Sequence, residues 1–372
     1  MILLQKISLL LNGLFFAHLL LVYYGSVFLS QQTANYDIQQ LSQEDRPGDT
    51  ISVSDHGNSD SPELFAADSS DKFDPSLPVV SSESNVIKSS ELSQPAEAIR
   101  QQSTSPLPTI FMITPTVDKA TRKADFTRLA QTVRQVPNLH WIVVEDGYEL
   151  CGSVANVLKR LISNYTYLAA PTPDYTLLGF ERDLNKGIFQ RNVALEWLRW
   201  RHKDLFRNNS TARGVVYFAD DDNTYDLRLF EMMRQVRLVG VWPVALVGGV
   251  KLEKPRKDAV TGELLGFEVG FAPNRTFAVD MAGFALGLQL VLSNPRGHFP
   301  LDTVRGWNEP ALFDSFDLSY DDIQVLGLDI RTPGGLLEPL VWHTKTTGAN
   351  LSQEDRFKKN YGRARSDEGW EV

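Results

Sequence analysis

The acidic triplet Asp220–Asp222 follows directly on the apolar run Val215–Phe218, which has the composition of a strand buried on both faces. Neighbouring carboxylates repel one another, and burying one of them unpaired is costly. A divalent cation such as Mg²⁺ or Mn²⁺ removes this cost, because hard ions take oxygen ligands and bring substrate phosphates with them. The triplet therefore predicts a metal and nucleotide-phosphate site, although Asn223 and Thr224 also suit a solvated acidic turn.

Basic side chains that could bind a diphosphate occur in two other stretches. Lys186 and Arg191 precede and enter a predicted helix, and an arginine can bind phosphate through two parallel hydrogen bonds. Both residues would equally suit a solvated helix face. His343 and Lys345 follow a short predicted strand near the C-terminus, from which they could reach a diphosphate. A histidine at a strand end more often has a structural role.

Glu309 is the candidate for proton transfer. It lies in the sequence RGWNEPAL, in the first turn of a predicted helix, and Pro310 suits the same turn. A carboxylate at this position can simply complement the helix dipole. Near a substrate, it could instead deprotonate an incoming hydroxyl as a general base. Both interpretations agree with the local sequence.

The surrounding pattern predicts an α/β fold in which these residues meet at one edge of a sheet. Predicted strands 109–114, 139–144, 165–169 and 215–218 alternate with predicted helices 125–136, 154–162, 187–201 and 227–236. Such alternation predicts a mostly parallel central sheet flanked by helices, with ligands at the carboxyl ends of the strands. Further on, the pattern predicts strands at 245–250, 264–271, 323–330 and 340–343 and a buried helix at 281–293.

The N-terminal third has a different organisation. Residues 7–29 contain no acidic residue, lysine or arginine and are long enough to cross a bilayer, which favours an uncleaved signal anchor over a cleaved signal peptide. Residues 1–6 then form a short cytoplasmic tail. The composition of residues 30–105 predicts a disordered luminal stem. We expect a catalytic domain at 106–372, with a nucleotide-binding half at 106–240 and an acceptor-binding half at 241–372.

Composition limits the partners of the chain. The 372 residues carry a formal net charge of −9, which argues against a nucleic-acid partner. Cys151 is the sole cysteine, so an intrachain disulfide is excluded. Glycosylation sequons, which fit a luminal location, start at Asn164, Asn208, Asn209, Asn274 and Asn350.

Seven blocks, in order, resemble the animal β1,3-glucuronyltransferases of glycosyltransferase family 43. They read PTIFMITPT, LHWIVVEDG, QRNVALEWLR, VVYFADDDNTYD, VDMAGFALGL, RGWNEPALF and VWHTKT, and they run from about residue 108 to residue 345. The resemblance implies a GT-A fold and an inverting, Mn²⁺-dependent transfer of glucuronate. The donor would be UDP-glucuronate, and the acceptor the 3-hydroxyl of a terminal galactose on a proteoglycan linker, glycoprotein or glycolipid. It also implies a single-pass type II protein of the Golgi membrane. The oligomeric state stays open, with a homodimer as one alternative.

The resemblance also implies a role for each candidate residue. Glu309 would be the general base, Asp222 the Mn²⁺ ligand, and Glu253 and Asp280 would bind the acceptor. Donor-binding residues would be Asp146, Lys186, Arg191, Asp220, Asp221, Arg275, His343 and Lys345.

This chain departs from the family pattern at two of the donor-binding positions. Lys186 and Lys345 stand where the family has arginine, and lysine lacks the two-pronged guanidinium. The alternatives are a relative that uses UDP-xylose, a catalytically silent Golgi scaffold and a lectin-like luminal module. The intact carboxylate triplet argues against the silent scaffold, because a silent protein has no physical reason to keep it.

Overall fold

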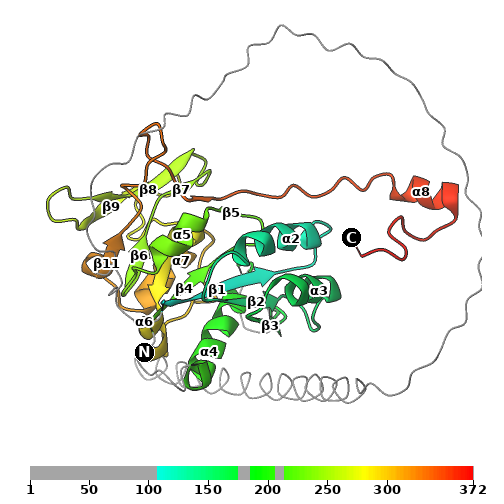
Figure 1. Cartoon of the computed structure of the whole chain (residues 1–372), viewed down its shortest axis with the longest axis horizontal. Coiled ribbons are helices and arrows are strands. Elements are labelled where there is room, and N and C mark those ends of the chain that lie inside the picture. The colour runs from blue at the N-terminus through cyan, green and yellow to red at the C-terminus, as the bar shows by residue number, and fades with distance from the viewer. Residues whose placement is uncertain (1–106, 175–184, 206–212, 372) are drawn as a thin grey trace, which may run out of the picture. The chain divides into compact units, whose positions relative to one another are not determined.

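The computed structural model describes residues 107–174, 185–205 and 213–371 (Figure 1). The predicted tail, membrane anchor and stem lie outside these residues, as do the sequons at Asn208 and Asn209. Within the described ranges, no helix combines the length and apolar character needed to cross a membrane. The described residues all belong to one compact unit, Ser93–Val372.

A seven-stranded sheet forms the centre of this unit, in the order β11-β6-β10-β4-β1-β2-β3. Its strands are β1 Thr109–Thr116, β2 Leu139–Glu145, β3 Tyr165–Ala169, β4 Gly214–Phe218, β6 Val239–Val241, β10 Phe284–Gly287 and β11 Ile323–Val325. All neighbours pair in parallel except β10, which is antiparallel to both β4 and β6. The prediction of an α/β fold with a mostly parallel central sheet is confirmed.

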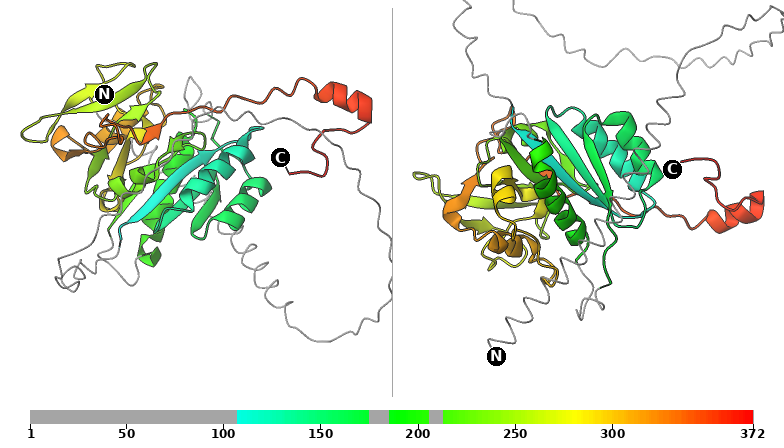
Figure 2. Two further views of the ribbon diagram at one scale, coloured as in Figure 1. Left: turned by 45° about the horizontal axis from the view of Figure 1, so that its top comes forward. Right: turned by 90° about the horizontal axis from the view of Figure 1, so that it is seen from below.

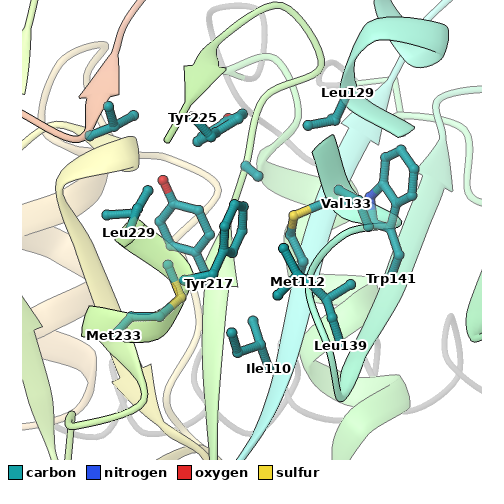
Figure 3. Packing of buried hydrophobic residues seen from close by; sticks show 14 of the residues in the cluster. Ile110, Met112, Leu129, Val133, Leu139, Trp141, Tyr217, Tyr225, Leu229 and Met233 are labelled. Carbon is teal, nitrogen blue, oxygen red and sulfur yellow. The ribbon is translucent and has the colours of Figure 1, made fainter. Parts of the chain in front are cut away.

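Helices cover both faces of the sheet (Figure 2). They are α2 Arg122–Val133, α3 Gly152–Leu161, α4 Ile188–Leu205, α5 Leu227–Met233, α6 Leu288–Ser293 and α7 Asn308–Ser315, and α8 Glu354–Tyr361 follows near the C-terminus. Apolar side chains of α2 and α5 share one cluster with Met112, Trp141 and Tyr217 of the sheet (Figure 3). Side chains of α3 belong to the same cluster. On the opposite face, the ring of Trp197 in α4 lies 5.4 Å from that of His140.

The apolar stretch 281–293 was predicted to be one helix, and that prediction is wrong. Its residues form a 3₁₀ turn, η1 Met281–Gly283, then strand β10 and then the short helix α6. Strand β10 lies between β4 and β6 and is buried on both faces, so its sequence is continuously apolar. A short apolar run of this kind does not distinguish a buried strand from a buried helix. Gly287 ends β10 and precedes α6, and only glycine fits there because a Cβ would lie 1.9 Å from the carbonyl oxygen of Arg237.

A second, five-stranded sheet has the order β5-β12-β7-β8-β9. Its strands are β5 Thr224–Tyr225, β7 Val244–Ala245, β8 Leu252–Lys257, β9 Leu264–Glu268 and β12 Val341–Trp342. The predicted strand 245–250 is wrong beyond Ala245, because Leu246, Gly248 and Gly249 have positive φ and turn the chain. Strand β12 pairs with β5, which begins two residues after Asp222, so residues 343–346 are brought to the acidic triplet.

Candidate active site

The carboxyl ends of the parallel strands meet at one edge of the central sheet. Thr116 at the end of β1 pairs with Glu145 at the end of β2, and Ile113 pairs with Phe218 at the end of β4. The residues that follow these strands therefore lie at the same edge. Two cavities of about 1480 Å³ and 320 Å³ open there and share Lys186, Arg191 and Asp220 as lining residues.

Every predicted site residue lines one of these cavities. The large cavity is lined by Lys186, Arg191, Asp220, Glu253, Arg275, Asp280, Glu309, His343 and Lys345. The small cavity is lined by Asp146, Lys186, Arg191, Asp220, Asp221 and Asp222. The fold thus brings together residues that are up to 199 positions apart, from Asp146 to Lys345. Their individual roles stay predictions.

The three carboxylates of the triplet have different surroundings. Asp220 Oδ1 accepts a hydrogen bond from the guanidinium of Arg191 at 2.5 Å. Asp221 is buried and accepts one from Lys119 Nζ at 2.7 Å. Burial raises the pKa of Asp221 to about 6, against the lowering effect of the Lys119 ammonium. Asp222 Oδ2 accepts a single weaker bond, from the backbone N–H of Thr346 at 3.3 Å.

Glu309 is the second residue of α7, and its side chain is only 12% exposed. Burial raises its pKa to about 7, and the negative charge of Asp280 acts in the same direction. A backbone N–H at the start of the helix and the charges of Arg275 and Arg191 act in the opposite direction. The carboxylate therefore lies in the large cavity with a pKa close to neutral pH, as a general base requires.

A histidine and a carboxylate form a pair beside Glu309. His343 Nδ1 lies 3.2 Å from Asp280 Oδ2, and the hydrogen bond to Asp280 raises the pKa of His343, against the lowering effect of burial. The other oxygen of Asp280 accepts from the N–H of Ala282 at 3.0 Å and so caps η1. Asp280 thus has a fixed orientation between the imidazole and the backbone.

Glu253, on β8, also lines the large cavity. Its side chain is buried, and Oε1 accepts backbone N–H bonds from Gly270 at 2.8 Å and Phe271 at 3.3 Å. The half-exposed ring of Phe271 lines the same cavity and lies 5.2 Å from the guanidinium carbon of Arg275. A carboxylate and an aromatic ring in one cavity can bind the hydroxyls and the apolar face of a sugar.

Asp146 lies in the small cavity and is held by Thr172. Thr172 donates its backbone N–H to Asp146 Oδ1 at 2.7 Å and its hydroxyl to Oδ2 at 2.8 Å. Gln190 of α4 donates to the Thr172 hydroxyl at 3.1 Å and to the carbonyl oxygen of Ala170 at 2.7 Å. Sequence reasoning missed Thr172, Gln190 and Lys119. Only Gln190 carries a signal in the sequence, because it stands next to Arg191, which was predicted to bind the donor.

A divalent cation is compatible with the chemistry of the triplet. The carboxylate of Asp222 offers hard oxygen donors and is bonded only weakly by the protein. Among the described residues, no cluster of three or more His, Cys, Asp or Glu side chains could hold a metal ion by itself. A cation at Asp222 would therefore need further oxygen ligands from a bound diphosphate and from water, which is the usual arrangement for small hard cations at phosphate sites.

Comparisons with known proteins agree with this geometry. The family model of glycosyltransferase family 43 matches residues 129–347. Galactosylgalactosylxylosylprotein 3-beta-glucuronosyltransferase 1 of Rattus norvegicus is 44% identical over 67% of this chain and 72% of its own length. The human protein of the same name is 43% identical over the same shares of the two chains. The 3-beta-glucuronosyltransferase sqv-8 of Caenorhabditis elegans is 40% identical over 68% of this chain and 69% of its own length.

The family match covers every predicted site residue in the two cavities, from Asp146 to Lys345. Relatives with more than 40% identity align with more than two thirds of their own length. This chain therefore belongs to glycosyltransferase family 43 and is a glycosyltransferase.

Proposed function

We propose that this enzyme transfers glucuronate from UDP-glucuronate to the 3-hydroxyl of a terminal galactose, with inversion at the anomeric carbon. The observation that carries the proposal is Glu309, a mostly buried carboxylate in the large cavity with a pKa of about 7. The activity for which the relatives are named supports the choice of sugar and acceptor. The acceptor class is a proteoglycan linker or another galactose-terminated glycan of a glycoprotein or glycolipid.

Glu309 acts as the general base of the reaction. Its ionised carboxylate takes the proton from galactose O3 while O3 forms a bond to the anomeric carbon. The bond between that carbon and the UDP oxygen breaks, and its electron pair leaves with UDP. Attack and departure take place on opposite faces of the sugar, so the configuration inverts without a covalent enzyme intermediate. A pKa near 7 suits this step, because the base must be ionised and still accept a proton.

Cations at the junction of the two cavities stabilise the leaving diphosphate. Lys186 and Arg191 line both cavities, and His343 and Lys345 extend the positive charge along the large one. Such preorganised charges stabilise the negative charge that develops on the leaving group. The remaining assignments are Asp146 to the uracil or uridine end, Asp220 and Asp221 to the ribose, Arg275 to the glucuronate carboxylate, and Glu253 and Asp280 to the acceptor.

We assign a Mn²⁺ ion to Asp222 as the cofactor of the reaction. The oxygen donors of Asp222 and its position beside the cations of the small cavity support this assignment. When bound, the ion supplies positive charge to the leaving diphosphate. Asp222 would hold the ion, and Thr346 would orient the Asp222 carboxylate through its backbone N–H.

We further propose that the enzyme is a single-pass type II protein of the Golgi membrane with a luminal catalytic domain. Support comes from the sequence, in which the apolar segment 7–29 precedes a polar, Ser-rich and Pro-rich segment of 30–105. A homodimer is the oligomeric state we would test first.

The test uses the full-length enzyme, purified in detergent with Mn²⁺. It is incubated with UDP-glucuronate or UDP-xylose and with Galβ1,3Gal or Galβ1,4GlcNAc as acceptor. We expect transfer from UDP-glucuronate that is lost with EDTA and falls by two to four orders of magnitude in Glu309→Gln. The matched control is Glu263→Gln, which makes the same change at an exposed residue that lines neither cavity.

The preferred acceptor would separate linker synthesis from capping of other glycans. Turnover with UDP-xylose alone would overturn the donor assignment. Tight binding of UDP without transfer from either donor would indicate a silent relative and overturn the proposed reaction.

A further inference from the structure

Asp125 carries a buried carboxylate that lines neither cavity. It lies in the first turn of α2, beside the buried apolar residues Phe126 and Leu129. A carboxylate at the start of a helix normally interacts with the helix dipole from an exposed position. Full burial is costly unless the carboxylate is paired and hydrogen-bonded, so the partners of Asp125 determine what it does.

Both oxygens of Asp125 are fully engaged. Oδ2 accepts from the Thr121 hydroxyl at 3.0 Å and lies 3.0 Å from Lys119 Nζ. Oδ1 accepts from the Thr346 hydroxyl at 2.7 Å and from the guanidinium of Arg128. Thr121 and Arg128 are local to α2, whereas Thr346 comes from the segment that follows β12. Two of these partners, Lys119 and Thr346, also bond to the acidic triplet.

The first connection to the triplet runs through Lys119. Its ammonium lies between two carboxylates, 3.0 Å from Asp125 Oδ2 and 2.7 Å from Asp221 Oδ1. A lysine side chain is flexible, and two carboxylates on either side hold its charge in one place. Asp125 therefore helps to fix the ammonium that compensates the charge of Asp221.

The second connection runs through Thr346. Its hydroxyl donates to Asp125, while its backbone N–H donates to Asp222 Oδ2 at 3.3 Å. Two residues earlier, the hydroxyl of Thr344 donates to the carbonyl oxygen of Asp222 at 2.5 Å. The segment 343–346 is thus held against the triplet at Thr344 and at Thr346. The hydrogen bond from the Thr346 hydroxyl to Asp125 restrains the segment at Thr346.

We propose that Asp125 is a positioning residue for the donor site. Through Thr346 and Lys119 it holds the segment 343–346 against the triplet, and so fixes the orientation of the Asp222 carboxylate. His343 and Lys345 belong to the same segment and line the large cavity, so their reach into the cavity depends on the same restraint. Asp125 itself touches no substrate. The inference rests on the proposed function only for the choice of UDP and Mn²⁺ as ligands.

The test compares Asp125→Asn and Thr346→Val in the full-length enzyme. Calorimetry gives the Kd of UDP in the presence of Mn²⁺, and kinetics give KM and kcat for UDP-glucuronate. We expect each variant to raise the Kd and the KM about tenfold, the usual effect of losing a hydrogen bond to a charged group, with a smaller change in kcat. The double variant should be little worse than Asp125→Asn alone, because that change already breaks the connection through Thr346.

Two control variants match these changes. Asp118→Asn removes the same charge from the loop before α2, where Asp118 is 92% exposed and pairs with Arg122. Thr127→Val removes a hydroxyl that donates to the carbonyl oxygen of Lys123 within α2. Both controls should keep the Kd and the KM of the unaltered enzyme.

A ligand-free measurement separates the inference from the proposed function. Hydrogen–deuterium exchange at 343–346 should become faster in Asp125→Asn and stay unchanged in Asp118→Asn. Unchanged exchange, or an unchanged Kd together with a lower Tm, would overturn the inference and leave Asp125 a purely stabilising residue. Faster exchange in an enzyme that never binds UDP with Mn²⁺ would support the restraint and overturn the proposed function instead.

Discussion

A guanidinium nitrogen of Arg275 lies 4.0 Å from Oε2 of Glu309, and both side chains are largely buried in the wall of the large cavity. The guanidinium is held in place by the carbonyl oxygens of Gly306, at 2.7 Å, and Phe271, at 3.2 Å. Its charge lowers the pKa of Glu309, while burial and Asp280 raise it. The near-neutral pKa of Glu309 is therefore a balance of opposing effects, and several predictions depend on it.

The rate of transfer should depend on the ionisation of Glu309. Because its pKa is about 7, kcat/KM should rise about tenfold per pH unit below pH 7 and level off above it. The measurement is a pH–rate profile with saturating Mn²⁺. The residual activity of Glu309→Gln should lack this midpoint. A midpoint near 4.5, the usual pKa of a glutamate, would contradict the raised pKa of Glu309, and a midpoint that persists in Glu309→Gln would show that the assigned base is wrong.

Removing the charge of Arg275 should move that midpoint upward. In Arg275→Gln, the positive charge that favours the ionised form of Glu309 is lost, so the carboxylate should titrate at higher pH. Arg275→Lys is the matched comparison, because it keeps the charge at a shifted position and should have a midpoint nearer to that of the unaltered enzyme. The same midpoint in all three proteins would contradict the electrostatic role given to Arg275.

Glu309 should also make the stability of the ligand-free enzyme depend on pH. Folding raises its pKa from 4.5 to about 7, so stability contributed by the protonated group is present below pH 4.5 and is lost as pH rises through 7. The loss is on the order of 3 kcal/mol. Glu309→Gln stays neutral, so its Tm should exceed that of the unaltered enzyme by several degrees at pH 8. At pH 4.5 the two Tm values should agree.

Loss of the Asp222 carboxylate should weaken activation by Mn²⁺. In Asp222→Asn, the concentration of Mn²⁺ that gives half-maximal activity should rise at least about tenfold, because a charged oxygen donor is lost. EDTA should abolish the activity of the unaltered enzyme, and added Mn²⁺ should restore it. Asp329→Asn makes the same change at an exposed carboxylate and should respond to Mn²⁺ normally. Full activity in EDTA would rule out the metal assignment.

Alanine substitutions at two neighbouring glycines test whether Glu253 binds the acceptor. Gly248 and Gly249 both have positive φ, of 60° and 78°, so alanine at either position strains the backbone by about 1–2 kcal/mol. A Cβ on Gly248 would lie 1.8 Å from Glu253 Oε1, whereas one on Gly249 meets nothing within 4 Å. Both alanine variants should lose stability, but only Gly248→Ala should raise the acceptor KM, by about tenfold. Equal acceptor KM values in the two variants would show that Glu253 does not contribute to acceptor binding.

The architecture at the carboxyl ends of the strands followed from local patterns. The apolar runs before Asp146 and before Asp220–Asp222 have the pattern of buried strands. Because these strands alternate with helices, they predict a parallel sheet whose carboxyl ends lie together. The antiparallel strand β10 could not be predicted from its sequence pattern. It pairs with β4 and β6 on its two edges and its residues are buried on both faces, and a buried helix would have the same composition.

The hydrogen bonds around the acidic triplet could not be predicted from the sequence. Asp125, Lys119 and Thr346 bond to residues about 100 or more positions away, to Asp221 and Asp222 or to one another across the fold. One signal was present, since Asp125 is a carboxylate on the apolar side of a helix that otherwise presents Phe126, Leu129 and Val133 to the core. The identity of its partners could not follow from that signal.

The amino-acid sequence by itself determined which chemical groups lie at the strand ends and to which family the chain belongs, because strand pattern and family blocks are local properties of the chain. Tertiary structure alone decided the burial and the pKa of those groups. Glu309 is a candidate base because its pKa is set by burial and by the charges of Asp280, Arg275 and Arg191, which come from three other segments. Desolvation and neighbouring charge set a pKa, and both depend on segments distant in sequence.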